Sequence, residues 1–239
     1  VKPSSRDQDR GVVHVQTTGR NQHGEIVLTL QRKVQIWKGN NEAQVEEVAL
    51  SDVQTIPCEL ALPAYDESQH YKELAHLAND DTYFEDFNVG ETIEHSRGRT
   101  VTTAHMEWTA MLDNTSQVHS NQYMIDQNPG RYIGGQLIVY GGIPFNLCLG
   151  LSCPDVGDNA VGDVCYVTGR HTGPVFVGDT VFASTEITGK RDYSNRPDLG
   201  IVETALRGHK FIPKDDNWDK MEIFYLEREM AVKRRSHYV

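Results

Sequence analysis

Residues 137–152 read LIVYGGIPFNLCLGLS, and they carry the strongest signal for the fold. Two glycines, Gly141 and Gly142, precede Pro144, and apolar residues then follow on nearly every side of the expected helix. Proline is favoured in the first turn of a helix, and an apolar surface all round is typical of a helix buried along its whole length. The stretch therefore predicts a central helix that other elements of the fold must enclose.

Strand segments are expected downstream of this helix, and one of them shows the period-two alternation of half-buried strands. We expect strands at about 163–169, 179–188, 200–211 and 222–233. Upstream, residues 91–102 are expected to be extended, and Thr102 or Thr103 can cap a helix over residues 104–112. One helix wrapped by an antiparallel sheet is an α+β fold.

An internal repeat indicates how the chain is organised. SSRDQDRGVV at 4–13 is similar to YSNRPDLGIV at 193–202. The alternation also recurs, as Leu28, Leu30, Arg32, Val34, Ile36 and as Phe224, Leu226, Arg228, Met230, Val232. We interpret both copies as the closing antiparallel strands of one kind of domain. Arg32 and Arg228 are expected to be structural, with buried stems and paired charges.

The first copy has almost nothing upstream of it, whereas the second has a long upstream section. The sequence thus predicts that residues 1–40 are the C-terminal strands of a truncated first domain. Residues 41–82 are expected to be a linker with one short helix near 68–78, and residues 83–239 a complete domain that carries the active site. Because the chain lacks an initiator Met, we expect a fragment or a trimmed chain.

Composition excludes several classes of function. The net charge of −11 opposes the phosphate backbone, so no nucleic-acid partner is expected. No apolar run approaches the length of a membrane span and no signal peptide is expected, which favours a cytoplasmic protein with no membrane partner. The four cysteines lack paired CxxC spacing and are expected to be reduced, and the ten histidines form no metal-ligand pattern, so no metal is expected.

Three polar or glycine-rich stretches could carry chemistry: DNTSQVHSN at 113–121, VYGG at 139–142 and GRHTGPVFVGDT at 169–180. Each alone also has a structural interpretation, with Asn114 as a helix C-cap, His119 as a core histidine and Asp179 as a turn residue. Free backbone N–H groups at Gly141 and Gly142 would form an anion or oxyanion site at the start of the helix.

The order and content of these stretches resemble the MaoC-like hydratases of the hot-dog fold. The matching segments are NTSQVH at 114–119, IVYGGI at 138–143 and PVFVGDT at 174–180, and the resemblance spans residues 83–239. It is strongest to those family members that hydrate mesaconyl-CoA. The resemblance implies an antiparallel sheet wrapped around a central helix, in a double hot-dog chain whose first copy is incomplete.

The resemblance also implies a hydro-lyase that reversibly adds water to an α,β-unsaturated acyl-CoA, converting mesaconyl-CoA to β-methylmalyl-CoA. His119 is then the general acid–base, because an imidazole titrates near neutrality, and Gly141 and Gly142 form the oxyanion hole. Most of the family has Asp five residues before the histidine, whereas this chain has Asn114, which can orient water but cannot take up a proton. No cofactor is implied, since CoA is part of the substrate.

The free carboxylate of a mesaconyl group requires a cation, for which Arg170 is the first candidate, followed by His171 and Arg131. Tyr140 is expected to bind substrate as well. The chain is expected to form a homo-oligomer or to pair with the missing first-domain segment. Two alternatives stay open: a hydratase or dehydratase acting on another enoyl-CoA, and a non-catalytic hot-dog partner subunit.

Overall fold

The structure is a computed structural model that describes residues 2–3, 9–40, 62, 64–66 and 68–239. The chain divides into two compact units, Val1–Glu59 and Leu60–Val239. Residues 4–8 of the internal repeat, residues 41–61 of the expected linker, and Cys58 lie outside the described residues.

The first unit is built on an antiparallel hairpin of β2 (Arg10–Arg20) and β3 (Ile26–Trp37), with the short β1 (Lys2–Pro3) beside β2. The strand predicted from the alternation is confirmed. Its half-burial is not, because Leu28, Leu30 and Ile36 are exposed, and so is Arg32. The described part of this unit holds strands alone, so no helix within it packs against the apolar face of β3.

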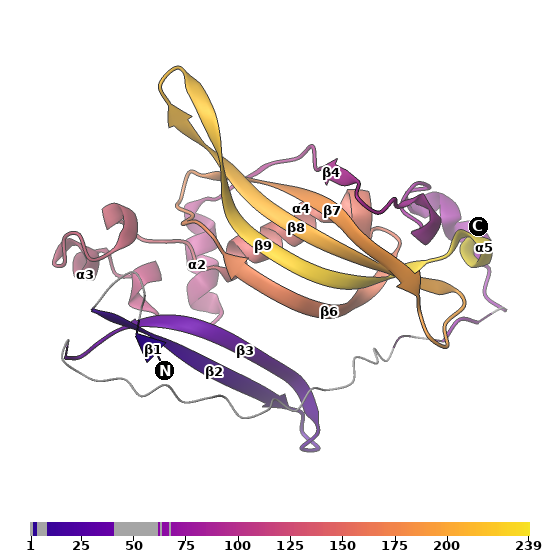
Figure 1. Cartoon of the computed structure of the whole chain (residues 1–239), viewed down its shortest axis with the longest axis horizontal. Helices are drawn as coiled ribbons and strands as arrows, with labels where there is room; N and C mark the ends of the chain where they lie inside the picture. Colours follow the sequence, from indigo (N-terminus) through magenta and orange to yellow (C-terminus); the bar gives the residue numbers. More distant parts are fainter. Residues whose placement is uncertain (1, 4–8, 41–61, 63, 67) are drawn as a thin grey trace. The chain divides into compact units, whose positions relative to one another are not determined.

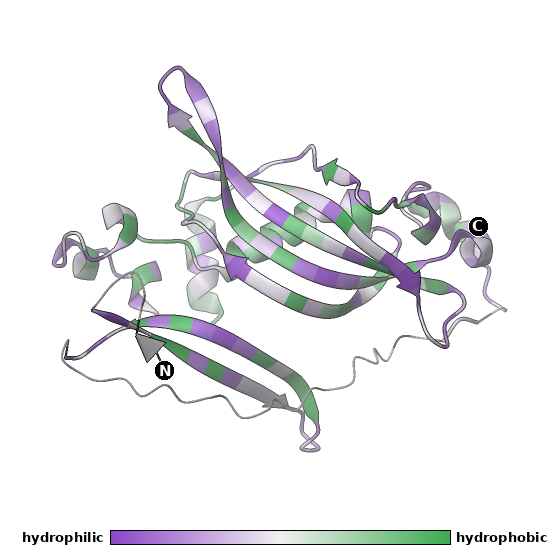
Figure 2. Ribbon diagram, viewed as in Figure 1, coloured by the Kyte–Doolittle hydropathy of each residue, from purple (hydrophilic) through white to green (hydrophobic). Residues whose placement is uncertain are grey.

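The second unit contains a curved antiparallel sheet in the order β4-β7-β8-β9-β6, with β5 also paired to β7 (Figure 1). Its strands are β4 (Thr92–Glu94), β5 (Arg99–Thr100), β6 (Ala160–His171), β7 (Thr180–Asp192), β8 (Leu199–Lys214) and β9 (Asn217–Lys233). The four predicted strands are confirmed, and each is longer than expected. Figure 2 shows that apolar and polar residues are interspersed along them.

Helix α4 (Gly142–Ser152) lies against this sheet and supplies the core (Figure 1). Ile143 and Cys148 of the helix pack in one cluster with Leu206 and Phe224 of the sheet. The α+β hot-dog arrangement is thereby confirmed. The expectation that the helix is buried all round is wrong, because Asn146 and Gly150, one turn apart, are exposed. These two residues interrupt the apolar surface on one side, and that side is not covered by the sheet.

Short helices and turns fill the connections. They are α1 (Tyr71–Leu74), η1 (Ala75–Leu77), η2 (Phe84–Asp86), α2 (Thr103–Met111), η3 (Gln117–His119), α3 (Gln122–Asp126), η4 (Ile133–Gly135), η5 (Cys153–Gly157) and α5 (Arg235–Tyr238). Helix α2 begins where predicted, after Thr102, whose backbone N–H donates to His105 Nδ1 at 3.0 Å. The helix expected near 68–78 is present as α1 and η1.

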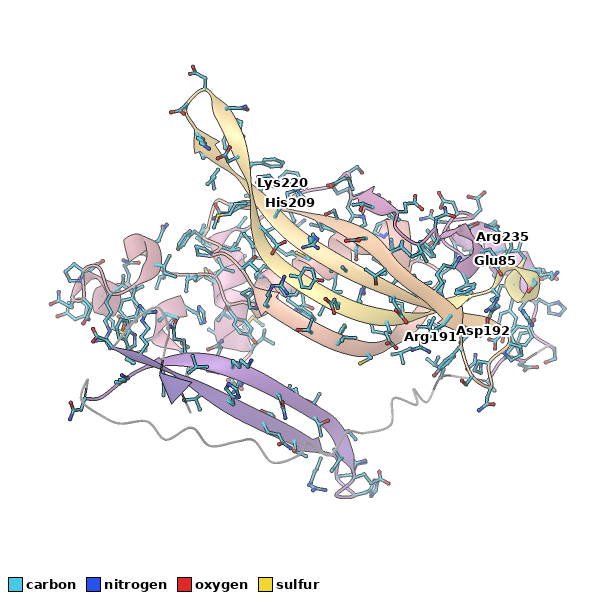
Figure 3. The ribbon with its side chains drawn as sticks, in the orientation of Figure 1. Glu85, Arg191, Asp192, His209, Lys220 and Arg235 are labelled. Carbon is cyan, nitrogen blue, oxygen red and sulfur yellow. The ribbon has the colours of Figure 1, made fainter. Side chains whose placement is uncertain are left out.

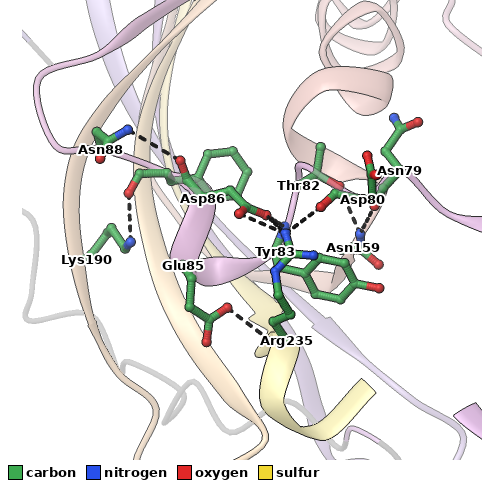
Figure 4. A network of polar contacts seen from close by, with 11 residues as sticks. Asn79, Asp80, Thr82, Tyr83, Glu85, Asp86, Asn88, Asn159, Lys190 and Arg235 are labelled. Atoms are coloured by element: carbon green, nitrogen blue, oxygen red, sulfur yellow. Dashed lines mark hydrogen bonds and ion pairs between the residues drawn. The ribbon is translucent and has the colours of Figure 1, made fainter. Parts of the chain in front are cut away.

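The segment that leads into the sheet is held by a polar network around α5 (Figure 4). Arg235 forms an ion pair with Asp86 at 2.6 Å, and its backbone N–H donates to Glu85 at 3.0 Å. Asn159 donates to Thr82 at 3.0 Å from the other side. These contacts connect the chain before β4 to the C-terminal end of the second unit. Among the described residues, no helix is both long and apolar enough to cross a bilayer.

Candidate active site

His119 is the last residue of η3, and its half-buried ring is oriented by one hydrogen bond. Its Nδ1 lies 2.8 Å from the carbonyl oxygen of Ile138. Because a carbonyl oxygen only accepts, Nδ1 carries the hydrogen, and Nε2 of the neutral ring has a free lone pair. His119 can therefore accept a proton at Nε2.

Asn114 follows the end of α2, where Asp113 adopts a left-handed conformation with φ of 54°. The backbone N–H of Asn114 donates to the Thr109 carbonyl at 3.3 Å, and its Oδ1 accepts from the Ser116 N–H at 3.0 Å. The residue thus closes the helix end and shapes the turn that leads to His119. Its Nδ2 group is available to donate a hydrogen bond to a water molecule.

Backbone hydrogen bonds bring the three candidate stretches together. Ile138 N–H donates to the Val118 carbonyl at 3.1 Å, so the VYGG turn lies beside the segment of His119. Val139 N–H donates to the Val175 carbonyl at 2.8 Å, so the same turn lies beside the 174–180 segment. The three stretches, which are separate in the sequence, therefore lie next to one another in the fold.

The start of α4 offers two free backbone donors. Ile143 N–H is used, donating to the Tyr140 carbonyl at 2.8 Å, and Pro144 has no N–H group. Within the described residues, no acceptor pairs with the N–H of Gly141 or of Gly142. Since the N-terminal N–H groups of a helix also sit at the positive end of its dipole, these two can stabilise a developing oxyanion.

Close packing of two rings requires glycine at both positions. A Cβ at Gly141 would lie 2.5 Å from Nε2 of His171, and one at Gly142 would lie 2.5 Å from the Tyr140 ring. Tyr140 also contacts His119 edge to face, with ring centroids 5.7 Å apart. The imidazoles of His119 and His171 therefore both approach the turn that holds the free N–H groups.

His171 ends β6 and packs against Phe224, with ring centroids 5.3 Å apart. Although part of the residue is exposed, desolvation by burial lowers the pKa of its ring below the ordinary value. The neutral form is thereby favoured.

The structure does not bring Arg170 to this site. Neighbouring residues of a strand point to opposite faces, and His171 faces α4 through its contact with Gly141. The Arg170 guanidinium instead lies 3.9 Å above the ring of Tyr225 on the other face of the sheet. Arg131 is on the exposed turn after α3, with its guanidinium 5.9 Å from the Tyr132 ring.

A buried lysine and a partly buried carboxylate support the turn of the 174–180 segment. Asp179 Oδ2 accepts from the Phe176 backbone N–H at 2.8 Å, which confirms its predicted turn role. The same oxygen accepts from Lys210 Nζ at 2.6 Å, and Lys210 is only 5% exposed. Sequence reasoning missed Lys210, although a lysine within the apolar strand β8 was a usable signal. Arg228 is buried as predicted, paired with Asp163 at 3.1 Å.

No metal centre is assigned, because no three His, Cys, Asp or Glu side chains of the described residues are grouped to hold an ion. The three cysteines of this part of the chain are free thiols.

Comparison with known proteins identifies two curated relatives. The chain is 36% identical over 242 residues to the β-methylmalyl-CoA dehydratase of Chloroflexus aurantiacus, across 97% of this chain and 67% of that protein. It is 33% identical over 206 residues to the mesaconyl-CoA hydratase of Cereibacter sphaeroides, across 82% of this chain and 55% of that protein. The chain thus spans about two thirds of the first relative and just over half of the second. No protein-family model matches.

Solved structures agree with these relatives. A MaoC domain protein dehydratase from Chloroflexus aurantiacus superposes with a TM-score of 0.81 at 30% identity, over 98% of this chain and 68% of that one. A Mycobacterium tuberculosis protein with a double hot-dog fold gives a TM-score of 0.65 at 16% identity, over 96% and 65% of the two chains, and supports the fold alone. The chain therefore belongs to the MaoC-like hydratases and dehydratases of the hot-dog fold, the family of β-methylmalyl-CoA dehydratase.

Proposed function

We propose that this chain carries the site of a hydro-lyase that reversibly adds water to mesaconyl-CoA and yields β-methylmalyl-CoA. One observation carries the proposal: His119, whose Nδ1 is engaged by the Ile138 carbonyl, lies beside the turn whose Gly141 and Gly142 N–H groups are free. A base and an oxyanion site in one place are what hydration of a conjugated thioester needs. The two curated relatives support the choice of substrate.

In the forward direction, His119 Nε2 takes a proton from water while the water oxygen bonds to the β-carbon. The electrons of the carbon–carbon double bond move toward the thioester, and negative charge develops on its carbonyl oxygen. The Gly141 and Gly142 N–H groups stabilise this enolate, at roughly 2–4 kcal/mol for each well-placed donor. His119 then returns its proton to the α-carbon. With one acid–base group, addition occurs on one face and is syn, and no metal or redox cofactor takes part.

Asn114 positions the water in this scheme. Its Oδ1 is held by the Ser116 N–H, so the direction of the amide is fixed by the turn. Nδ2 can then donate to the water oxygen and leave a water proton directed toward His119.

Recognition of the second carboxylate of mesaconyl-CoA is assigned to His171. This ring contacts the diglycine turn, whereas Arg170 lies on the opposite face of the sheet. A carboxylate bound beside His171 favours the protonated imidazole, and the pair becomes a charge-assisted hydrogen bond. Tyr140 forms part of the same wall, and Arg131 is the remaining cation candidate.

A side-by-side hydration assay with mesaconyl-CoA and crotonyl-CoA tests this function. We expect turnover of mesaconyl-CoA with a clear preference over crotonyl-CoA. Equal rates on the two would contradict the carboxylate assignment and favour the second candidate, an enoyl-CoA hydratase for uncharged acyl chains. The observation that favours this second function is the position of Arg170, which lies away from the site and cannot bind a carboxylate there. No hydration of either substrate would contradict the function itself.

We further propose that residues 1–40 form the closing strands of a first hot dog and that residues 83–239 carry the chemistry. An incomplete first domain needs a partner, so we propose that the chain forms an oligomer or pairs with a segment that completes this domain. We also propose that the enzyme is cytoplasmic. The oligomer is tested by measuring the mass of the purified chain in solution, which is expected to exceed the mass of one protomer.

A further inference from the structure

A hollow of about 620 Å³ lies at the base of the hairpin that joins β8 to β9. Its walls are aromatic: Phe182, Phe211 and Trp218, with Pro213 beside them. The turn Gly178–Thr180 closes one side. None of these aromatic residues takes part in the chemistry proposed for His119.

The strand register places these rings on one face. Pro213 is the cross-strand partner of Trp218, and Phe211 lies two residues before Pro213. Alternate residues of a strand share a face, so Phe211, Pro213 and Trp218 point the same way. Phe211 meets Phe182 edge to face, with ring centroids 5.4 Å apart.

The rings are open to solvent. Trp218 is 62% exposed and Phe211 is 42% exposed, which is unusual for large aromatic side chains. Figure 1 shows that β8 and β9 continue beyond the other strands, so no further strand covers this face. A planar apolar ring could therefore insert beside Trp218 and Phe211 without displacing protein.

The hollow lies at the same end of the sheet as the candidate active site. Strand β6 ends at His171 and antiparallel β7 begins at Thr180, so both residues mark that end. The 174–180 segment joins the two places, because Val175 binds the Val139 N–H and Gly178–Thr180 lines the hollow. From Val175 to Gly178 is three residues, a span of at most roughly 11 Å.

A positive charge accompanies the aromatic face. Lys220 is the cross-strand partner of Phe211 and lies near His209 at the neck of the hairpin (Figure 3). Its contact with Glu94 is long, at 3.4 Å, and both side chains are about half exposed or more. The ammonium group is therefore available to a phosphate without breaking a buried ion pair.

We propose that this hollow binds the adenine ring of the CoA thioester, with Lys220 beside the phosphates of the nucleotide. The inference rests on the proposed function, since it assigns the far end of the same substrate. A purine presents a flat apolar face and stacks on aromatic side chains, and the pantetheine arm links it to the thioester at Gly141 and Gly142.

The test compares an acyl-CoA with the matching acyl-pantetheine, which lacks the adenine nucleotide. Trp218→Ala is expected to raise KM for the acyl-CoA by roughly 5- to 150-fold, the range for losing one base–aromatic stack, with kcat unchanged. KM for the acyl-pantetheine should stay at the parent value. Trp218→Phe should restore most of the acyl-CoA KM, because a ring face is regained.

Ile212→Ala is the matched control, because Ile212 belongs to the same hairpin but its side chain points to the face opposite Phe211 and Pro213. It is expected to behave as the parent protein. Equal KM changes for both thioesters in Trp218→Ala, or no change for either, would overturn the adenine subsite while leaving the hydratase function in place.

A binding measurement separates failure of the subsite from failure of the function. Adenosine 3′,5′-bisphosphate is expected to quench tryptophan fluorescence in the parent protein but not in Trp218→Phe. This result needs no turnover, so it stands even if neither thioester is hydrated. Equal quenching in both proteins would contradict stacking on Trp218.

Discussion

The Nδ1–H group of His119 donates a 2.8 Å hydrogen bond to the backbone carbonyl of Ile138. This contact joins the acid–base candidate to the strand-like segment that leads into Gly141 and Gly142. Ile138 N–H returns a bond to the Val118 carbonyl, so two bonds fix one segment against the other. The orientation of the imidazole therefore depends on backbone atoms of the same turn that supplies the oxyanion donors.

Gly141→Ala is expected to reduce hydration strongly while the protein still folds. The new Cβ would lie 2.5 Å from His171 Nε2, so either the imidazole or the start of α4 must move. Loss of one aligned oxyanion donor costs about 10²- to 10³-fold in kcat. Steady-state kinetics with mesaconyl-CoA checks this expectation.

Gly150→Ala is its control on the same helix. A Cβ there meets nothing within 4 Å, and Ala exceeds Gly in helix propensity by about 0.8–1.0 kcal/mol. We expect parent activity and equal or higher stability. If both alanine variants lose activity alike, the effect belongs to α4 in general and not to the turn.

Lys210→Met is expected to destabilise the protein by about 3–5 kcal/mol, because it leaves the Asp179 carboxylate without its buried cation. Urea unfolding measures the change in free energy. The double variant Lys210→Met with Asp179→Asn should recover part of the loss, since the uncompensated charge is then removed. A double variant as unstable as the sum of the two single variants would contradict a direct coupling.

His171→Ala should raise KM for mesaconyl-CoA by roughly 10- to 100-fold, as expected for losing a hydrogen bond to a charged group. KM for crotonyl-CoA, which has no second carboxylate, should change far less. Arg170→Met, one residue away on the opposite face, should leave both values near the parent. A selective loss in Arg170→Met alone would reverse the assignment of the carboxylate contact.

The stability of the fold is expected to fall as the pH drops below about 6.5. Burial, and then the nearby Lys220, lower the pKa of His209 from its ordinary value of 6.5, while Glu94 acts in the opposite sense. Below pH 6.5 the unfolded chain takes up a proton that the folded His209 resists, so stability rises with pH through this range. His95 and His171 shift in the same direction, because burial lowers the pKa of each.

His209→Phe should flatten this pH dependence in part. Phenylalanine keeps the ring contacts with Phe182 and Phe211, and it removes a buried Nδ1 that has no hydrogen-bond partner among the described residues. The midpoint of thermal unfolding, measured between pH 5.5 and 8, should then vary less than in the parent. An unchanged slope would show that His209 does not contribute.

The regular part of the fold could be predicted because its signals are local. Period-two alternation predicted the strands that became β3 and β9, and Pro144 with the glycines before it marked the start of α4. The exposed residues Asn146 and Gly150 were overlooked because a largely apolar sequence does not show which side of a helix faces the sheet. Exposure of the β3 face could not be predicted either, since it depends on what packs there.

The candidate site was predictable as motifs but not as geometry. Arg170 was expected to bind the free carboxylate of the substrate, yet β6 has register shifts between Asp163 and Cys165 and between Tyr166 and Thr168. Each irregularity changes which residues face α4. The face on which a residue near the end of β6 lies therefore cannot be predicted by counting alternate residues along the sequence. The role of the Ile138 carbonyl could not be predicted from the sequence, because every residue has a backbone carbonyl group.

The central claim is that His119 supplies the proton acceptor of hydration, and His119→Asn tests it most directly. The asparagine Nδ2 group can occupy the place of Nδ1 and keep the hydrogen bond to the Ile138 carbonyl, while no group remains at the position of Nε2. We expect an unfolding midpoint close to that of the parent and a 10²- to 10⁴-fold lower kcat for mesaconyl-CoA hydration. A folded His119→Asn protein that turns over within a few-fold of the parent would contradict the account.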